Sequence, residues 1–99
     1  MAEDFGFAAP PFDAAAALQR LKRELRELGL AEREGVFERR GVAIARAAID
    51  GPSLDAALVR RPQRSGPQWQ ARMLKSSADV RDFVAECKRR LAGWSDRDE

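Results

Sequence analysis

Side chains that could carry out catalysis or bind a metal are scarce in this sequence. It contains no histidine, the commonest general base and metal ligand of proteins. Its single cysteine, Cys87, belongs to an apolar helical stripe, so we expect a buried small side chain and not a reactive thiol. One cysteine without histidine cannot make a zinc site. We therefore expect no metal and no cofactor.

The acidic side chains cluster in two places, and neither cluster indicates catalysis. Glu32 and Glu34 flank Arg33 in a loop-like stretch. Asp79 and Asp82 come at the expected start of a helix, where carboxylates interact favourably with the helix dipole. No glycine-rich phosphate-binding fingerprint is present in the sequence. We therefore expect a non-enzymatic protein with no small-molecule substrate.

Arginine is the remaining source of binding chemistry, because it is concentrated in the middle of the chain. Residues 39–75 carry a net charge of +6, against −3 for residues 1–38 and −1 for residues 76–99. A basic surface suits contacts with phosphate groups, although it can also be a simple solvated face. Five cations of this segment are our candidates for contact with nucleic acid: Arg60, Arg61, Arg64, Arg72 and Lys75.

A helix is predicted before this basic segment, beginning after Asp13, which is a suitable N-cap. Gly29 supplies a left-handed stop, and Leu30 can contact Leu25 beyond it. We expect the apolar stripe to pack inside the domain, and the alternative is a helix that pairs two copies of the chain. The stripe follows an a/d pattern and consists of Ala14, Leu18, Leu21, Leu25 and Leu28.

A second helix is predicted after the basic segment, over residues 75–94. Ser76 is the expected N-cap, and Asp79 stands at the capping-box position. Gly93 is the expected left-handed stop, after which Trp94 folds back on the end of the helix. The apolar stripe needs a partner surface and consists of Val80, Phe83, Val84, Cys87 and Leu91.

Strands separated by turn signals are predicted between the helices. Asp50–Ser53 has strong turn chemistry, and Pro62–Pro67 forms a second loop. Residues 31–35 are interpreted as a polar connection, and residues 37–40 either extend the first strand or form a short hairpin ahead of it. The three predicted strands are Val42–Ile49, Leu54–Arg61 and Trp69–Leu74.

A rival interpretation makes this middle part helical, since alanine favours helix. Four glycines and three prolines within residues 35–67 oppose it, because each costs about 1–3 kcal/mol inside a helix. We therefore favour an α+β fold of order α-β-β-β-α, in which two helices pack on one face of a small antiparallel sheet. The alternative is an all-α bundle of four short helices.

Alternation along the strands predicts which side chains the helices cover. Trp69 and Met73 are assigned to the covered face, together with Leu54 and Leu58. The second helix then acts as a lid over Trp69 and Met73. The other face of the sheet is left open, and three apolar side chains are expected there for contact with a partner: Ala57, Val59 and Leu74.

Length and targeting signals indicate one small domain in a reducing compartment. A chain of 99 residues suits a single domain, which we place at 13–94, with a flexible arm over 1–12 and a tail over 95–99. The acidic N-terminus lacks a signal-peptide pattern, and no apolar run approaches the ~20 residues that span a bilayer. We therefore expect a cytoplasmic protein that does not contact membranes.

Two functional hypotheses follow from these observations. The first is a domain that forms a homodimer or binds another protein through its open sheet face or a sheet edge, because short sheets leave unpaired edges. The second is a nucleic-acid-binding module that uses the basic segment 39–75.

Overall fold

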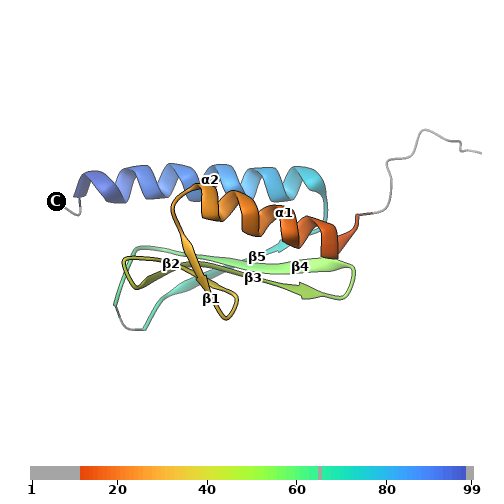
Figure 1. Cartoon of the computed structure of the whole chain (residues 1–99), viewed down its shortest axis with the longest axis horizontal. Coiled ribbons are helices and arrows are strands. Elements are labelled where there is room, and N and C mark those ends of the chain that lie inside the picture. Colours follow the sequence, from red (N-terminus) through yellow and green to blue (C-terminus); the bar gives the residue numbers. More distant parts are fainter. Residues whose placement is uncertain (1–11, 65, 98–99) are drawn as a thin grey trace, which may run out of the picture.

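The computed structural model describes residues 12–64 and 66–97, and it has two layers (Figure 1). Two helices, α1 (Ala14–Glu27) and α2 (Ser77–Arg97), lie side by side on one face of a five-stranded sheet. The strands are neighbours in the order of the sequence and all pair antiparallel: β1 (Ala31–Arg33), β2 (Val36–Arg39), β3 (Val42–Asp50), β4 (Ser53–Val59) and β5 (Trp69–Leu74). The predicted α+β fold is confirmed, and the all-α alternative is wrong.

β1 and β2 add two strands to the three predicted, and residues 37–40 follow the second of their two predicted alternatives, a short hairpin ahead of the first predicted strand. Residues 31–35, interpreted as a polar connection, form β1 and the turn that leads into β2. That turn is Glu34-Gly35, with φ of 54° and 81°, and the next is Arg40-Gly41, with φ of 56° and 78°. Two consecutive residues with positive φ are what a two-residue hairpin turn requires, because they match the twist of the flanking strands.

The turn between β3 and β4 is the one that the sequence predicted. Asp50 pairs with Ser53, so only Gly51 and Pro52 connect the two strands. Gly51 has a φ of 58°, which glycine adopts without steric cost. β4 ends at Val59, two residues before the predicted end.

The predicted boundaries of α1 are confirmed by hydrogen bonds. The Asp13 carboxylate accepts from the backbone N–H of Ala16 at 3.1 Å. At the other end the N–H of Leu30 donates to the carbonyl of Leu25 at 3.3 Å, and the N–H of Gly29 donates to that of Arg26 at 2.9 Å. These two bonds make a Schellman ending, which turns Leu30 into the core.

The predicted start of α2 is confirmed, but its predicted end is wrong. The Ser76 hydroxyl accepts from the N–H of Asp79 at 3.1 Å, and the Asp79 carboxylate accepts from the N–H of Lys75 at 2.9 Å. Gly93 lies inside the helix, which continues to Arg97 and takes in part of the expected tail. Trp94 packs against the core from within the helix. This packing offsets the loss of helix stability, roughly 1 kcal/mol, that Gly93 causes relative to alanine.

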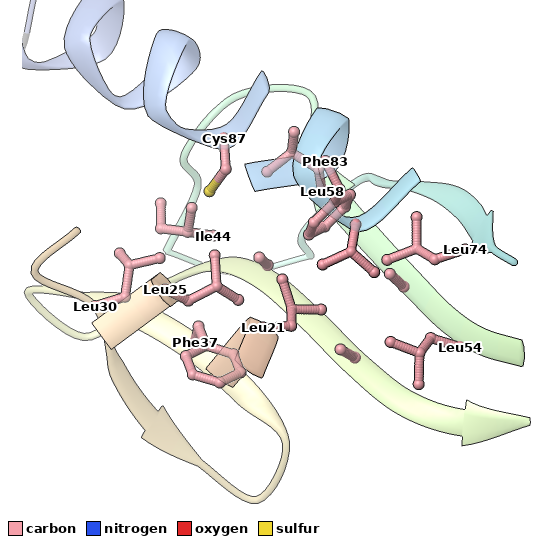
Figure 2. Packing of buried hydrophobic residues seen from close by; sticks show 14 of the residues in the cluster. Leu21, Leu25, Leu30, Phe37, Ile44, Leu54, Leu58, Leu74, Phe83 and Cys87 are labelled. Atoms are coloured by element: carbon pink, nitrogen blue, oxygen red, sulfur yellow. The ribbon is translucent and has the colours of Figure 1, made fainter. Parts of the chain in front are cut away.

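The core lies between the helices and the sheet, and Figure 2 shows most of its buried residues. Leucines of α1 and the Val80–Leu91 stripe of α2 meet Phe37, Leu54 and Leu58 from the sheet. No buried residue in the described part of the chain is polar or charged. Phe12 packs at the edge of this core, as expected. The remainder of the predicted arm, 1–11, and residues 98–99 lie outside the described residues.

A β-bulge adds one residue to the core from β3. Phe37 pairs with Ala45, whereas Glu38 pairs with Ala43, so Ile44 is the extra residue of the longer strand. Side chains normally alternate between faces, but a bulge interrupts the alternation. Ile44 and Ala45 are consequently both fully buried.

Substitution of two glycines tests the end of α2. Gly93→Ala is expected to raise the free energy of unfolding by about 0.5–1 kcal/mol, since alanine is the better helix residue. Gly29→Ala is the matched control, because a Cβ at either position meets no atom within 4 Å, yet Gly29 has a φ of 92°. Its left-handed backbone should make the control less stable by roughly 1–2 kcal/mol. Urea unfolding followed by circular dichroism measures both, and destabilisation by Gly93→Ala would contradict the continued helix.

Candidate functional site

The face of the sheet opposite the helices, here called the open face, is defined by the strand register. Residues that pair directly across strands project to the same face. Ala57 of β4 pairs with Arg46 of β3 and Ala71 of β5. The next row on this face contains Ala48, Asp55 and Met73. Ala48, Ala71 and Met73 are exposed.

The predicted orientation of β5 is wrong. Leu74 was expected on the open face, but it pairs with Leu54, lies in the core and is only 1% exposed. Met73 was expected under α2, but it is on the open face and 45% exposed. Trp69 pairs with Val59 and is likewise on the open face. Strict alternation predicts two faces without indicating which one the helices cover. The two faces of this strand were therefore exchanged in the prediction.

A cation–π contact covers part of the open face. The Arg46 guanidinium lies 5.2 Å from the centre of the Trp69 ring. Because Arg46 belongs to β3 and Trp69 to β5, the arginine side chain must cross the strand between them, which carries Ala57 and Val59 on this face. Both of these predicted partner-contact residues are on the open face as expected, but they are fully buried within the chain itself.

Arg46 also contacts an acidic neighbour on the open face. Its Nη1 lies 3.8 Å from the Asp55 carboxylate, and the two side chains are 35% and 45% exposed. A pair this long and this exposed contributes little to stability. Arg46 and Asp55 were not predicted as binding residues, since the sequence does not show that their strands place them side by side.

Arg90 ties α2 to the sheet on the helix-covered side. Its Nη1 donates to the carbonyl of Val59 at 3.0 Å and to Oε1 of Gln70 at 2.8 Å. Its Nε donates to the Glu86 carboxylate at 2.6 Å, and Arg89 pairs with the same carboxylate. Hydrogen bonds from Arg90 and Arg89 lower the pKa of Glu86. This arginine therefore joins α2 to the end of β4 and the start of β5.

The thiol of Cys87 is buried and poorly suited to act as a nucleophile. The side chain packs in the core and is inaccessible to solvent (Figure 2). Desolvation by burial raises its pKa to about 11, so it stays protonated at neutral pH. Within residues 12–64 and 66–97, no group of three histidine, cysteine or acidic residues could hold a metal ion. No helix of the same residues is long and apolar enough to cross a membrane.

The structure does not bring the five predicted nucleic-acid contacts together. Arg60, Arg61 and Arg64 are exposed in the loop between β4 and β5. Arg72 is exposed on β5, but it pairs with Ala56 and so projects to the helix side of the sheet. Lys75 follows β5 at the opposite end of the strands. Only the three loop arginines form a cluster.

Two hollows lie between elements of the described structure. One, of about 590 Å³, is lined by the first turns of both helices, including Ala16, Ala17 and Val80. The other, of about 540 Å³, lies where α1 ends and is lined by Arg39, Arg40 and Lys88, among others. Neither contains a catalytic arrangement of side chains.

Comparisons of the chain with protein-family models, with curated proteins and with solved structures find no match. The functional argument therefore rests on the geometry of these surfaces.

Acid sensitivity should depend on Glu86. Because its pKa is lowered from 4.5 in the folded chain, its charged form stabilises the fold above that pH, and this contribution is lost as pH falls through the lowered value. Glu86→Gln should therefore be less stable than the parent at neutral pH, and the difference should shrink in acid. Urea unfolding over a pH series measures this. Glu27→Gln, which removes one exposed charge from α1, is the control, and parallel curves for the parent and Glu86→Gln would contradict the role of Arg90.

Burial of Cys87 predicts slow thiol modification. The folded protein should react with a disulfide reagent at least about a hundredfold more slowly than the protein in denaturant, because the thiolate is both rare and inaccessible. Absorbance of the released aromatic thiol follows the reaction. A rate in the folded state close to that of the unfolded chain would contradict the buried position.

Proposed function

We propose that the protein is a non-enzymatic binding domain that forms a homodimer through its open sheet face. The observation that carries this proposal is Met73, which is 45% exposed on a face that no helix covers. Among the described residues, only Ile49 is another large apolar side chain with comparable exposure. An exposed apolar side chain surrounded by other small apolar groups is typical of an interaction surface.

The small side chains around Met73 support sheet-to-sheet packing. Ala48 and Ala71 are exposed next to it and add no bulk. Two sheets pack face to face at about 10 Å with interdigitated side chains. Alanines near a single methionine leave room for the methionine of a facing sheet.

Charge complementarity favours a second copy as the occupant. Arg46 and Asp55 place opposite charges side by side on the open face. A two-fold dimer brings the same patch from both copies together, so each charge can meet its opposite on the other copy. Each charge that the interface desolvates then has an opposite charge beside it, which avoids the cost of a buried unpaired charge.

The size of the face suits a weak dimer. The five strands contain 29 residues in total. At about 3.3 Å per residue and about 4.8 Å between strands, they cover roughly 460 Å². This area is smaller than the ~800 Å² per partner that stable complexes bury. We expect a dimer whose population depends on concentration.

The side-chain chemistry supports binding over catalysis. The chain has no histidine, and its one thiol is buried in the core. Neither a general base of the usual kind nor an accessible thiol nucleophile is therefore at hand. A single unpaired cysteine also suits a reducing compartment, so we propose a cytoplasmic location.

A pair of charge substitutions tests the dimer. Met73→Glu should convert it to a monomer, because two carboxylates would be brought together at the interface without partners. Ile49→Glu is the matched control, since Ile49 is 50% exposed but pairs with Leu54 and so projects to the other face. It should remain a dimer. Size-exclusion chromatography with light scattering over a range of concentrations measures the mass.

Two results would contradict this proposal. The parent protein could remain a monomer at the highest concentration that stays soluble. Alternatively, Met73→Glu and Ile49→Glu could weaken the dimer equally, which would place the interface away from the open face. Circular dichroism of both variants verifies that they are folded.

A further inference from the structure

The antiparallel order of the strands brings two arginine-bearing loops to one end of the sheet. β2 ends and β3 begins at the turn that carries Arg40. β4 ends and β5 begins at the loop that carries Arg60, Arg61 and Arg64. Because β3 pairs antiparallel with β4, both connections lie at the same end (Figure 1). Arg40 is 20 positions or more from the three loop arginines in the sequence, but all four belong to one region of the surface.

The second half of α2 adds a lysine to this end. Lys88 lines the hollow where α1 ends, together with Arg39 and Arg40. We define the basic end as five exposed cations: Arg40, Arg60, Arg61, Arg64 and Lys88. None of these five makes an ion pair with a residue that the structure describes.

Two carboxylates near this end are already paired with other cations. Glu86, on the preceding turn of α2, is already paired with Arg89 and Arg90. Glu38 of β2 is paired with Arg33. At the opposite end of the strands, Asp50 lies at the turn between β3 and β4. The sheet therefore has a cationic end and an end that carries carboxylates.

Arg40 occupies the first position of a two-residue hairpin turn. It has a φ of 56°, a region where asparagine and glycine are favoured over long side chains. Asn-Gly is the usual sequence for such a turn, and here arginine takes the first position. Glu34 takes the same position in the preceding turn, with a φ of 54°.

We propose that the basic end binds the phosphate backbone of double-stranded nucleic acid. An extended polyanion fits better than a small anion, because the five cations are spread over two loops and a helix, and only Arg40 and Lys88 of them line the hollow. Duplex is favoured over single strands, which are normally held by stacking on exposed aromatic rings. Trp69 is half-buried against Arg46, and no exposed aromatic ring is present among the described residues.

This site is independent of the proposed dimer. The basic end consists of loops and one helix position, whereas the dimer uses the open face around Met73. Binding of nucleic acid by Met73→Glu would therefore separate the two proposals, since that variant is expected to be monomeric and to keep the basic end.

Salt dependence measures the number of phosphate contacts. Five contacts predict that the affinity for a duplex falls about 500-fold between about 50 mM and about 200 mM salt. The probe is a fluorescent DNA duplex of about 20 base pairs. Its phosphates lie about 1.7 Å apart along the helix axis, so a duplex of this length offers enough phosphates for all five cations. Fluorescence anisotropy gives the affinity at each salt concentration.

Two triple variants with the same change in net charge locate the site. Replacing Arg60, Arg61 and Arg64 with Gln should lower the affinity at least about tenfold and reduce the slope of log affinity against log salt by about 2.7. Replacing Arg23, Arg72 and Lys75 with Gln is the control, because these exposed cations lie outside the basic end. The control should change this slope by less than about 0.9, which is the value for one phosphate contact.

Arg40→Asn tests the turn separately. This variant should be at least as stable as the parent, since asparagine tolerates positive φ. It should bind the duplex more weakly, and the slope of log affinity against log salt should fall by about 0.9, the value for one phosphate contact. The proposal is overturned by absence of binding at about 50 mM salt, by equal effects of the two triple variants, or by tighter binding of a single strand or of polyglutamate than of the duplex.

Discussion

Burial of one face of the sheet under two helices is the constraint on which the other features depend. A five-stranded sheet cannot hide both faces with only two helices, and the core is assembled from the side that the helices reach. Each large side chain that becomes fully buried contributes about 1.5–3 kcal/mol. Phe37, Phe83 and Leu21 are among the largest of these. The uncovered face, with Met73 and the Arg46–Trp69 contact, is a direct consequence of this asymmetry.

Features set by local hydrogen bonds were predictable from the sequence. The Asp13 cap, the Schellman ending at Gly29 and the Ser76–Asp79 capping box involve residues within a few positions of one another. The turn at Gly51 belongs to the same class. The β1–β2 hairpin was missed because its turn uses Glu-Gly instead of Asn-Gly, and the β2–β3 hairpin, with its Arg-Gly turn, was only one of two alternatives. Glycines six positions apart, at Gly35 and Gly41, were a usable signal for both turns.

Features set by packing were less predictable. Trp69 and Met73 alternate with polar side chains along β5, and this alternation suggested that both belong under α2. The helix side of β5 instead holds Leu74 and Gln70, and Gln70 accepts a hydrogen bond from Arg90. Trp69 has the Arg46 guanidinium over its ring. Likewise, Arg40 lies near the loop arginines because of the order of the strands in the sheet. The pattern of residues along the sequence does not predict this order. The basic segment was identified, but its division between the two ends of the sheet was not.

The order of the strands also has a consequence for how the chain reaches this structure. Every strand pairs with its neighbour in sequence, and the connections from β1 to β4 contain two residues each. Such contacts close short loops, which lose little chain entropy, so the meander can form early. α1 and α2, in contrast, begin more than 60 residues apart and lie side by side on one face of the sheet that separates them in sequence. Their encounter is the step of high contact order, and we expect it to limit the rate of folding.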